Sequence, residues 1–301
     1  MKKFYKISLM MMICFFIAHS AFADVTVDGF CYLEGETDHS GTKVLFNSAS
    51  PSAVTDSVYT NSDGSYLTEL ILGIYTVHFS HTEWLTYTIA DEIIIFEDIT
   101  LEDVMLTSAL VEVSGPQSGT WTSDYLYQVI GDISVPEGET LIIEPGVTIK
   151  FMDFYSLNIS GTLLASGTET DSIIFTSGQT FCKWGDWNEI KFEDSSNDNS
   201  IISHSRIEHG GSGVHCSNSS PNISNNNFIN NAYGIECNDH SSPTISYNTF
   251  DNFTGINCYD FSTPFINNNT FSNNTYVIRC SYSSPTISNN IINNNSGHVL
   301  K

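Results

Sequence analysis

The stretch Ser220-Pro-Asn-Ile-Ser-Asn-Asn-Asn-Phe228 returns as Ser242-Pro-Thr-Ile-Ser-Tyr-Asn-Thr-Phe250, and this repetition decides the fold. Two further copies begin at Thr263 and Ser284, so successive copies start 22, 21 and 21 residues apart. Each copy has an isoleucine, an asparagine and a large apolar residue at fixed distances after its proline. A period in the low twenties indicates an array in which each unit buries its apolar face only against its neighbours.

Within each unit the apolar residues alternate in short pieces, such as Ile235-Glu-Cys237, that are separated by Asn, Ser and Gly. This alternation is typical of strands, and neither a leucine framework nor a helical period of 3.6 is present. At ~3.3 Å per residue, one repeat makes a circuit of ~70 Å that can close into a three-sided coil. Coils stacked ~4.8 Å apart form a right-handed parallel β-helix, which we predict for residues 110–301.

The recurring asparagines have a structural explanation. When they stack in register, their amides hydrogen-bond up and down a column, and Asn also tolerates the left-handed backbone conformation of a sharp corner. A sugar-binding row of amides is the functional alternative, but buried amides normally satisfy one another. The predicted asparagine ladder consists of Asn226, Asn248, Asn269 and Asn290.

Four cysteines recur in phase with the prolines and should therefore stack on the inner face, one in each coil. Free thiols packed in the core are the favoured interpretation. Vertical disulfides are an alternative because paired strands lie within reach of each other. A metal site is less favoured, since sulfurs in a line do not form a tetrahedron. The predicted column consists of Cys216, Cys237, Cys258 and Cys280.

Residues 131–151 and 161–168 carry a second signal for the same fold. They read GDISVPEGETLIIEPGVTIKF and GTLLASGT. These stretches resemble the opening coils of the pectin-lyase-like β-helix superfamily. The resemblance implies a right-handed β-helix and a carboxylate- and aromatic-bearing face that binds uronic-acid polymers.

Outward positions beside the cysteine column form the candidate ligand site. Strand alternation directs polar side chains to the solvent there, and the resemblance implies that such a face binds polysaccharide. The alternative is the uneven polar surface of any soluble solenoid. The candidates on this face and at the following corner are His215, Glu236, Asp239, Asn257, Tyr259, Asp260 and Arg279.

Trp184 and Trp187 lie in a longer insertion between two predicted coils, residues 177–188. Aromatic side chains on a loop can stack against sugar rings, so both are candidate ligand contacts. The alternative is that they pack over the coil beneath them.

A catalytic constellation is missing from the sequence pattern. Eliminative cleavage of uronates needs a basic group beside a bound cation, whereas Arg279 stands alone in the repeats. Hydrolysis needs carboxylates that face each other across a groove, and the paired-Asp, Gly-His-Gly and Arg-Ile-Lys signatures of polygalacturonases are absent. We therefore predict no catalytic and no metal-ligating residue, and catalysis stays an open question.

Residues 24–109 form a separate module, with short alternating strands at the spacing of a β-sandwich. Two pieces, Thr60-Asn-Ser-Asp-Gly-Ser-Tyr66 and Leu72-Gly-Ile-Tyr-Thr-Val77, resemble the carboxypeptidase regulatory-like family. The resemblance implies a transthyretin-like sandwich that serves as an accessory module. Acidic residues crowd its end between Asp91 and Asp103, where an edge that resists pairing is favoured over a calcium site.

Residues 1–23 predict a cleavable signal peptide. Lys2, Lys3 and Lys6 precede an apolar run, and Ala21-Phe-Ala23 is an A-x-A cleavage signal. We expect a secreted or cell-surface bacterial protein, cleaved after Ala23 and without membrane insertion, because the run is too short to span a bilayer. Seven basic residues then remain against 34 acidic ones, and a net charge of −27 excludes nucleic acid as a partner.

These observations favour a non-catalytic protein that displays or binds carbohydrate or another extracellular ligand, with polysaccharide or a cell-surface glycan as its partner. The alternatives are a lyase, hydrolase or epimerase acting on uronic-acid polymers, and a structural spacer. No cofactor is expected, although calcium is an open option. The chain stops partway through a coil at Lys301, so we expect it to continue in a longer protein.

Overall fold

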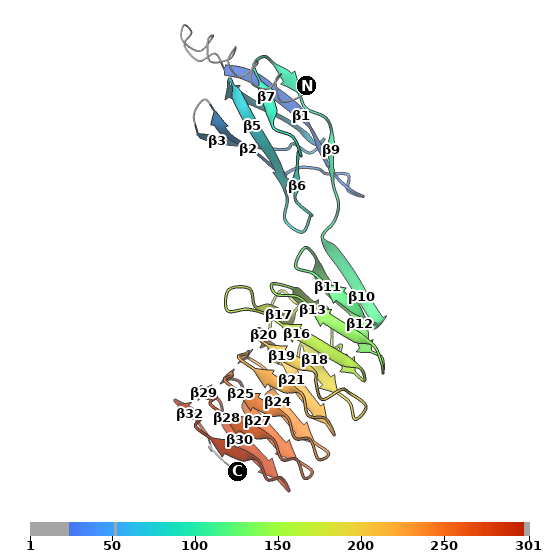
Figure 1. Ribbon diagram of the computed structural model, residues 1–301, viewed down its shortest axis with the longest axis vertical. Helices are drawn as coiled ribbons and strands as arrows, with labels where there is room; N and C mark the ends of the chain where they lie inside the picture. The colour runs from blue at the N-terminus through green and yellow to red at the C-terminus, as the bar shows by residue number, and fades with distance from the viewer. Residues whose placement is uncertain (1–23, 51–52, 298–301) are drawn as a thin grey trace, which may run out of the picture. The chain divides into compact units, whose positions relative to one another are not determined.

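The computed structural model describes residues 24–50 and 53–297, whose regular elements are all β-strands. The expected signal peptide, residues 1–23, lies outside the described residues. By its internal contacts the chain divides into two units, Met1–Ala109 and Leu110–Lys301, which are described separately below (Figure 1). The described residues contain no helix that could span a membrane.

The first unit consists of two sheets around one hydrophobic core. One sheet has the order β4-β1-β8, with β9 also beside β1, and the other has the order β3-β2-β5-β6, with β7 beside β5. Phe46, Tyr75 and Phe79 fill the core, where they are fully buried. The strands are β1 (Asp24–Leu33), β2 (Lys43–Ser50), β3 (Val54–Tyr59), β4 (Ser65–Ile71), β5 (Gly73–Ser80), β6 (Tyr87–Thr88), β7 (Ile93–Ile95), β8 (Ile99–Thr100) and β9 (Val104–Leu106).

The second unit is a right-handed β-solenoid of about eight turns, in which strands pair in parallel from coil to coil (Figure 1). The predicted β-helix is therefore confirmed. At its start, β10 (Leu110–Pro116) pairs with β12 (Leu126–Val135). β12 extends around a corner, because its first half pairs with one side of the next coil and its second half with another.

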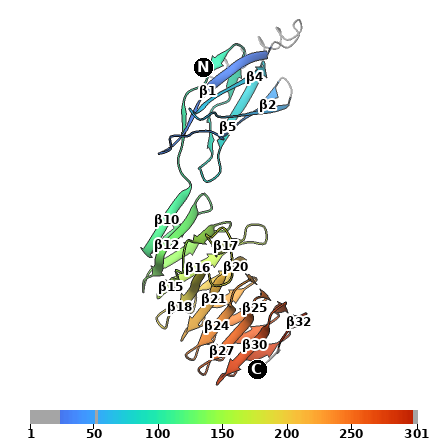
Figure 2. The same cartoon turned by 180° about the vertical axis from the view of Figure 1, so that it is seen from behind.

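Each coil has three sides, and the strands of successive coils form three faces (Figure 2). The cysteine face consists of β15 (Leu157–Ile159), β18 (Trp187–Phe192), β21 (Gly210–Ser217), β24 (Tyr233–Asn238), β27 (Thr254–Tyr259) and β30 (Tyr276–Ser281). The phenylalanine face consists of β14 (Thr148–Phe151), β17 (Ile173–Ser177), β20 (Ser205–Glu208), β23 (Asn227–Ile229), β26 (Thr249–Asp251), β29 (Thr270–Ser272) and β32 (Ile291–Asn293). The isoleucine face consists of β11 (Gly119–Trp121), β13 (Thr140–Ile143), β16 (Thr162–Ser166), β19 (Ile201–Ser203), β22 (Asn222–Ser224), β25 (Thr244–Ser246), β28 (Phe265–Asn267) and β31 (Thr286–Ser288).

The interior of the solenoid is built from columns of identical side chains. Phe228, Phe250 and Phe271 stack nearly parallel, with ring centroids 5.0 and 4.8 Å apart. The cysteine face aligns Cys216, Cys237, Cys258 and Cys280 in register, and all four are free thiols. Contacts with the neighbouring thiols and burial raise the pKa of the Cys237 thiol, which keeps it protonated.

Asparagine ladders hold two of the three corners. The backbone N–H and the Nδ2 of Asn226 both donate to Oδ1 of Asn248, at 2.9 and 3.1 Å, and the same pattern continues to Asn269 and Asn290. A second ladder occupies the next corner and satisfies buried backbone groups in the same way. It consists of Asn231, Asn252, Asn274 and Asn295.

The left-handed backbone conformation falls on the residue before a ladder asparagine and not on the ladder asparagine itself. Asn225 has a φ of 58° and Asn230 a φ of 54°. Because Asn tolerates this conformation best among residues with a side chain, the corner sequence Asn-Asn divides two tasks between neighbours. The first asparagine turns the chain and the second one bonds to the next coil.

Gly234 is required by the close approach of a corner to the phenylalanine stack. A Cβ atom at this position would lie 2.6 Å from the carbonyl oxygen of Gly255 and 2.7 Å from Cδ1 of Phe250. Such distances are far inside van der Waals contact, so the side chain must be absent. Val277 occupies the equivalent position in the last described coil, where Ile292 replaces the phenylalanine.

Candidate functional site

Strand register decides which outward side chains of the cysteine face meet. The predicted site residues His215, Glu236, Asn257 and Arg279 come together in one column, and a second column lies three residues earlier in each strand, or two earlier on β18, where the register shifts. The first column consists of Lys191, His215, Glu236, Asn257 and Arg279. The second column consists of Glu189, Ser212, Tyr233, Thr254 and Tyr276.

Both ring nitrogens of His215 lie within hydrogen-bond distance of a side-chain oxygen. Its Nδ1 lies 2.9 Å from Oε2 of Glu189, and its Nε2 lies 3.0 Å from Oδ1 of Asn238. The amide orientation of Asn238 is fixed because its Nδ2 donates to Asp239 at 3.1 Å. Burial lowers the pKa of His215, but the Glu189 hydrogen bond and the charges of Glu189 and Glu236 outweigh it and raise the pKa above its ordinary value.

Glu236 is satisfied by its neighbours on the same face. It accepts hydrogen bonds from Ser212 Oγ and, at 3.1 Å, from Asn257 Nδ2. Burial, and then the charges of Glu236 and other nearby carboxylates, raise the pKa of Tyr259, which therefore keeps its proton. Arg279 lies over the ring of Tyr276, with 5.2 Å to the centroid. Among the predicted site residues, Glu236 and Asn257 therefore bond to each other, while His215 bonds to Glu189 and Asn238 and Arg279 contacts Tyr276.

The pH dependence of stability tests the His215 pair. Because its folded pKa is raised, His215 contributes stability fully below about pH 6.5, and this contribution is lost as the pH rises through the folded pKa. We expect His215→Gln to lower the free energy of unfolding by roughly 1.5–3 kcal/mol at pH 5.5 and by less at pH 9, measured by urea denaturation. An equal loss at both pH values would contradict the charged pair.

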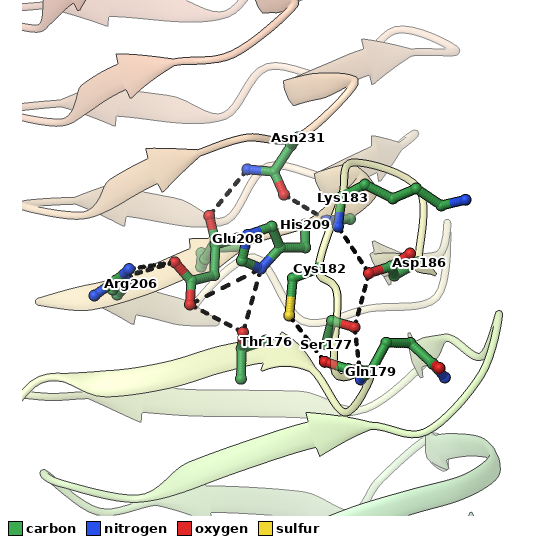
Figure 3. Close-up of polar contacts among 12 residues, drawn as sticks. Thr176, Ser177, Gln179, Cys182, Lys183, Asp186, Arg206, Glu208, His209 and Asn231 are labelled. Atoms are coloured by element: carbon green, nitrogen blue, oxygen red, sulfur yellow. Dashed lines mark hydrogen bonds and ion pairs between the residues drawn. The ribbon is translucent and has the colours of Figure 1, made fainter.

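The second candidate region is the loop between β17 and β18, residues 178–186, which is held by hydrogen bonds within the loop and to the following coil (Figure 3). Oδ2 of Asp186 accepts hydrogen bonds from Ser177 Oγ and from the Lys183 backbone N–H, both at 2.9 Å. The backbone N–H of Asp186 donates to the carbonyl of His209 at 3.0 Å. These contacts give an exposed loop one defined conformation.

This loop forms one side of an open groove of about 720 Å³. Phe154 and Phe181 line it and are 58% and 89% exposed, and Trp184 on the same loop is 61% exposed. Ring faces, carboxylates, an amide and a single lysine therefore converge on one concave surface. The lining residues are Asp153, Phe154, Gln179, Thr180, Phe181, Lys183, Gly185 and Asp186.

Beside the loop lies a polar cluster around the buried Glu208 (Figure 3). The carboxylate of Glu208 accepts hydrogen bonds from Arg206 Nε at 2.7 Å and from Thr176 Oγ1 at 2.9 Å. Its carbonyl oxygen accepts from Trp187 Nε1 at 2.8 Å, and the Trp187 ring stacks on Phe151 with centroids 4.4 Å apart. Trp187 is fully buried, so the expectation that it contacts a ligand is wrong. The alternative for both tryptophans was packing over the coil beneath them. Only Trp187 packs in this way.

Metal binding has little support from the side chains. Within residues 24–50 and 53–297, no three His, Cys, Asp or Glu side chains converge as metal ligands. At the acidic stretch between Asp91 and Asp103, Asp98 accepts a hydrogen bond from the Thr26 N–H, and nearby Asp28 accepts one from Thr100 Oγ1.

The solenoid is also the part of the chain that matches a known protein family. The model of the family described as "right handed beta helix region" matches residues 131–271 and 170–300, which together exceed half of the chain. The chain belongs to this right-handed β-helix family. The family match stops short of the first unit, and no curated protein matches the chain.

Two solved structures are similar to part of this β-helix protein. They are an N-terminal and a C-terminal interface mutant of a type II cohesin-X-dockerin complex from Acetivibrio cellulolyticus. Each is 22% identical, with a TM-score of 0.24, and the match covers 28% of this chain. Since it spans only 58% of the length of those chains, the similarity indicates neither fold nor partner.

Proposed function

We propose that this β-helix protein is an exported, non-catalytic carbohydrate-binding protein and that the loop groove holds its ligand. The observation that carries the proposal is the groove itself, where Phe154 and Phe181 expose ring faces beside polar groups. Aromatic rings with few rotatable bonds provide large contact areas at low entropic cost, and loops on a rigid scaffold are preferred sites for binding. Sugars, which combine apolar CH faces with hydroxyls, fit such a lining.

The carboxylates of Asp186 and Glu208 have structural hydrogen-bond partners, and this favours binding over catalysis. Asp186 holds the loop through two hydrogen bonds, and Glu208 is bonded by Arg206 and Thr176. A general acid or base must be able to reach a substrate proton, whereas these groups have structural partners. Secretion or display at a bacterial cell surface would give the groove access to glycans, as the sequence of residues 1–23 predicts.

We propose in addition that residues 24–109 are a carboxypeptidase regulatory-like sandwich that acts as an accessory module. Two sheets that share one core support this assignment. The turn in the resembling stretch supports it as well, because the Gly64 N–H donates to the Asn61 carbonyl at 2.9 Å and Gly64 has a φ of 85°. Only glycine adopts that conformation without strain.

Binding to immobilised glycans tests the groove. We expect the natural protein to bind members of an array of plant and microbial polysaccharides in calcium-containing buffer. The double variant Phe181→Ala/Trp184→Ala should bind at least tenfold more weakly, a loss of about 1.4 kcal/mol, because both rings leave the surface without disturbing the core. The matched control is Phe265→Ala, which removes an exposed ring from the isoleucine face.

Two outcomes would contradict the proposed function. One is equal binding by the natural protein and the double variant, which would locate the ligand elsewhere. The other is release of unsaturated uronates or reducing ends from polygalacturonate, measured by absorbance at catalytic protein concentrations, which would favour the lyase or hydrolase alternative.

A further inference from the structure

The corner between the cysteine face and the isoleucine face carries side chains that the fold does not need. In consecutive coils, the residues in the left-handed conformation there include His240 (φ 65°), Phe261 (φ 62°) and Tyr282 (φ 51°). The backbone N–H of Phe261 donates to the carbonyl of Tyr282 at 2.7 Å, so these two occupy adjacent coils at the same corner. We name His240, Phe261 and Tyr282 the ring stripe.

Phenylalanine and tyrosine are unfavourable choices for this backbone conformation. A bulky side chain at positive φ is rare, whereas Asn, Asp and His are enriched there. The same protein uses asparagine for this task at other corners and at Asn218, the equivalent of Tyr282 three coils earlier. Phe261 and Tyr282 therefore occupy positions at which asparagine would serve the fold better.

Burial of the two rings does not offset the cost of this backbone conformation. Phe261 is 63% exposed and Tyr282 is 82% exposed, and the only ring contact among the stripe residues is the stacking of His240 on Phe261, at 5.4 Å and 15°. Residues in strained backbone conformations concentrate at binding sites, where the strain is retained for function. Phe261 and Tyr282 meet that description because their backbone is strained and their rings still face the solvent.

Two of the corners are also lengthened to carry a ring. Four residues separate the cysteine from the proline in the coils of Cys216 and Cys280, but five separate them in the coils of Cys237 and Cys258. In each longer corner the left-handed pair is an aspartate followed by a ring, Asp239-His240 and Asp260-Phe261. Each longer corner therefore exposes a carboxylate beside a ring.

We infer that the ring stripe is a second binding site and that it takes one strand of a neutral polysaccharide, lying along the solenoid axis. The exposed parts of Phe261 and Tyr282, on adjacent coils, provide apolar ring surface for sugar rings. The carboxylates of Asp239 and Asp260 accept hydrogen bonds from sugar hydroxyls. The site is separate from the loop groove and shares with the proposed function only the premise that the ligand is a carbohydrate.

Charge excludes the other polymers that stack on rings. Single-stranded nucleic acid needs a positively charged groove beside its stacking platform, whereas Asp239 and Asp260 flank this one. The same carboxylates repel polyuronates, and the net charge of −24 over the whole sequence adds to that repulsion. An uncharged glycan avoids both penalties.

The test separates ligand binding from packing through stability. The variants are Phe261→Asn and Tyr282→Asn, singly and together, in the complete mature protein. Because asparagine relieves the backbone strain, we expect the Tm to stay unchanged or to rise by roughly 2 °C. In affinity electrophoresis through gels containing hydroxyethyl cellulose, xylan or galactomannan, we expect the double variant to lose at least fivefold in affinity for the polymer that retards the natural protein.

Tyr247→Asn is the matched control. Tyr247 is 59% exposed and has a φ of 58°, but it lies at a different corner, where the equivalent positions in the adjacent coils are Asn225 and Asn268. Its replacement makes the same chemical change in the same backbone conformation without touching the stripe. We expect this variant to be retarded like the natural protein.

The proposal is overturned if the stripe variants are retarded as strongly as the natural protein, or if none of the neutral polymers retards the natural protein. Stronger retardation by polygalacturonate than by neutral polymers also overturns it. A Tm that falls by several degrees in the stripe variants would show that the rings serve packing. Loss of retardation in Phe181→Ala/Trp184→Ala alone would support the loop groove and reject the stripe.

Discussion

Replacing Asn248 with alanine is expected to lower the free energy of unfolding by about 3–5 kcal/mol, because this side chain makes four buried hydrogen bonds. Its Oδ1 accepts from the N–H and the Nδ2 of Asn226, and its Nδ2 donates to the Ile223 carbonyl and to Oδ1 of Asn269, all within 3.1 Å. Alanine leaves these partners unsatisfied in the interior, at roughly 1–3 kcal/mol for each unpaired group. Equilibrium urea denaturation measures the loss.

Asn222→Ala provides the control, since Asn222 lies exposed on β22, one coil earlier than Thr244. We expect that variant to differ from the natural protein by less than about 0.5 kcal/mol. Similar losses of unfolding free energy at Asn222 and Asn248 would mean that the asparagine content of the whole solenoid, and not the ladder, stabilises the coils. Asn252→Ala, in the second ladder, should match Asn248→Ala.

Phe250→Ala is expected to cost about 3–5 kcal/mol by creating a cavity in the middle of the phenylalanine column. Phe250 is fully buried and its ring stacks between Phe228 and Phe271. Because each coil contacts only its neighbours, the loss should fall on the interfaces on both sides of this coil. Thermal or urea denaturation followed by far-UV circular dichroism measures it.

Phe265→Ala is the corresponding control, because Phe265 lies on the outward side of β28 and is 41% exposed. A loss below about 1 kcal/mol is expected there. If Phe250→Ala destabilised the protein no more than Phe265→Ala does, the inward orientation of the phenylalanine column would be incorrect.

Much of the solenoid could be predicted because its period determines which residues share a column. Once the coils have 21 or 22 residues, alternation within strands places Phe228 inward and Glu236 outward. The second asparagine ladder was missed although the same period contains it, at Asn231, Asn252, Asn274 and Asn295. Alignment on the prolines drew attention to the first corner only, and spacing alone would have revealed the other.

The loop groove could not be predicted in the same way. Its shape depends on hydrogen bonds from Asp186 and Gly185 to His209 and Gly210, which lie more than 20 residues later in the chain. Trp184 and Trp187 look alike in the sequence, yet one side chain is mostly exposed and the other fully buried. Alternation counted back from Ile190 would place Trp187 on the outer side of β18, and the irregularity between Glu189 and Ile190 turns it inward, so the sequence pattern does not distinguish the two.

The first unit shows where alternation is informative and where it is not. Alternation in the sequence predicts strands at 43–46, 65–69, 74–78 and 85–89 of the first unit. The first three lie within β2, β4 and β5. The expected strand at 85–89 shortens to β6, Tyr87–Thr88, and two short strands, β8 and β9, were not expected. Strands of two or three residues depend on their partner for stability and carry too little pattern of their own.

Site-resolved alkylation of the cysteines tests the stacked-coil arrangement most directly. The mature protein is treated with iodoacetamide in native buffer, then with a second, mass-distinct reagent in denaturant without reductant, and each cysteine is read by peptide mass spectrometry. We predict that exposed Cys182 reacts in the native state, that partly buried Cys280 reacts slowly, and that the fully buried cysteines react only after denaturation. Rapid native labelling of Cys237 and Cys258 would contradict the inward column, and their failure to react after denaturation would contradict its free thiols.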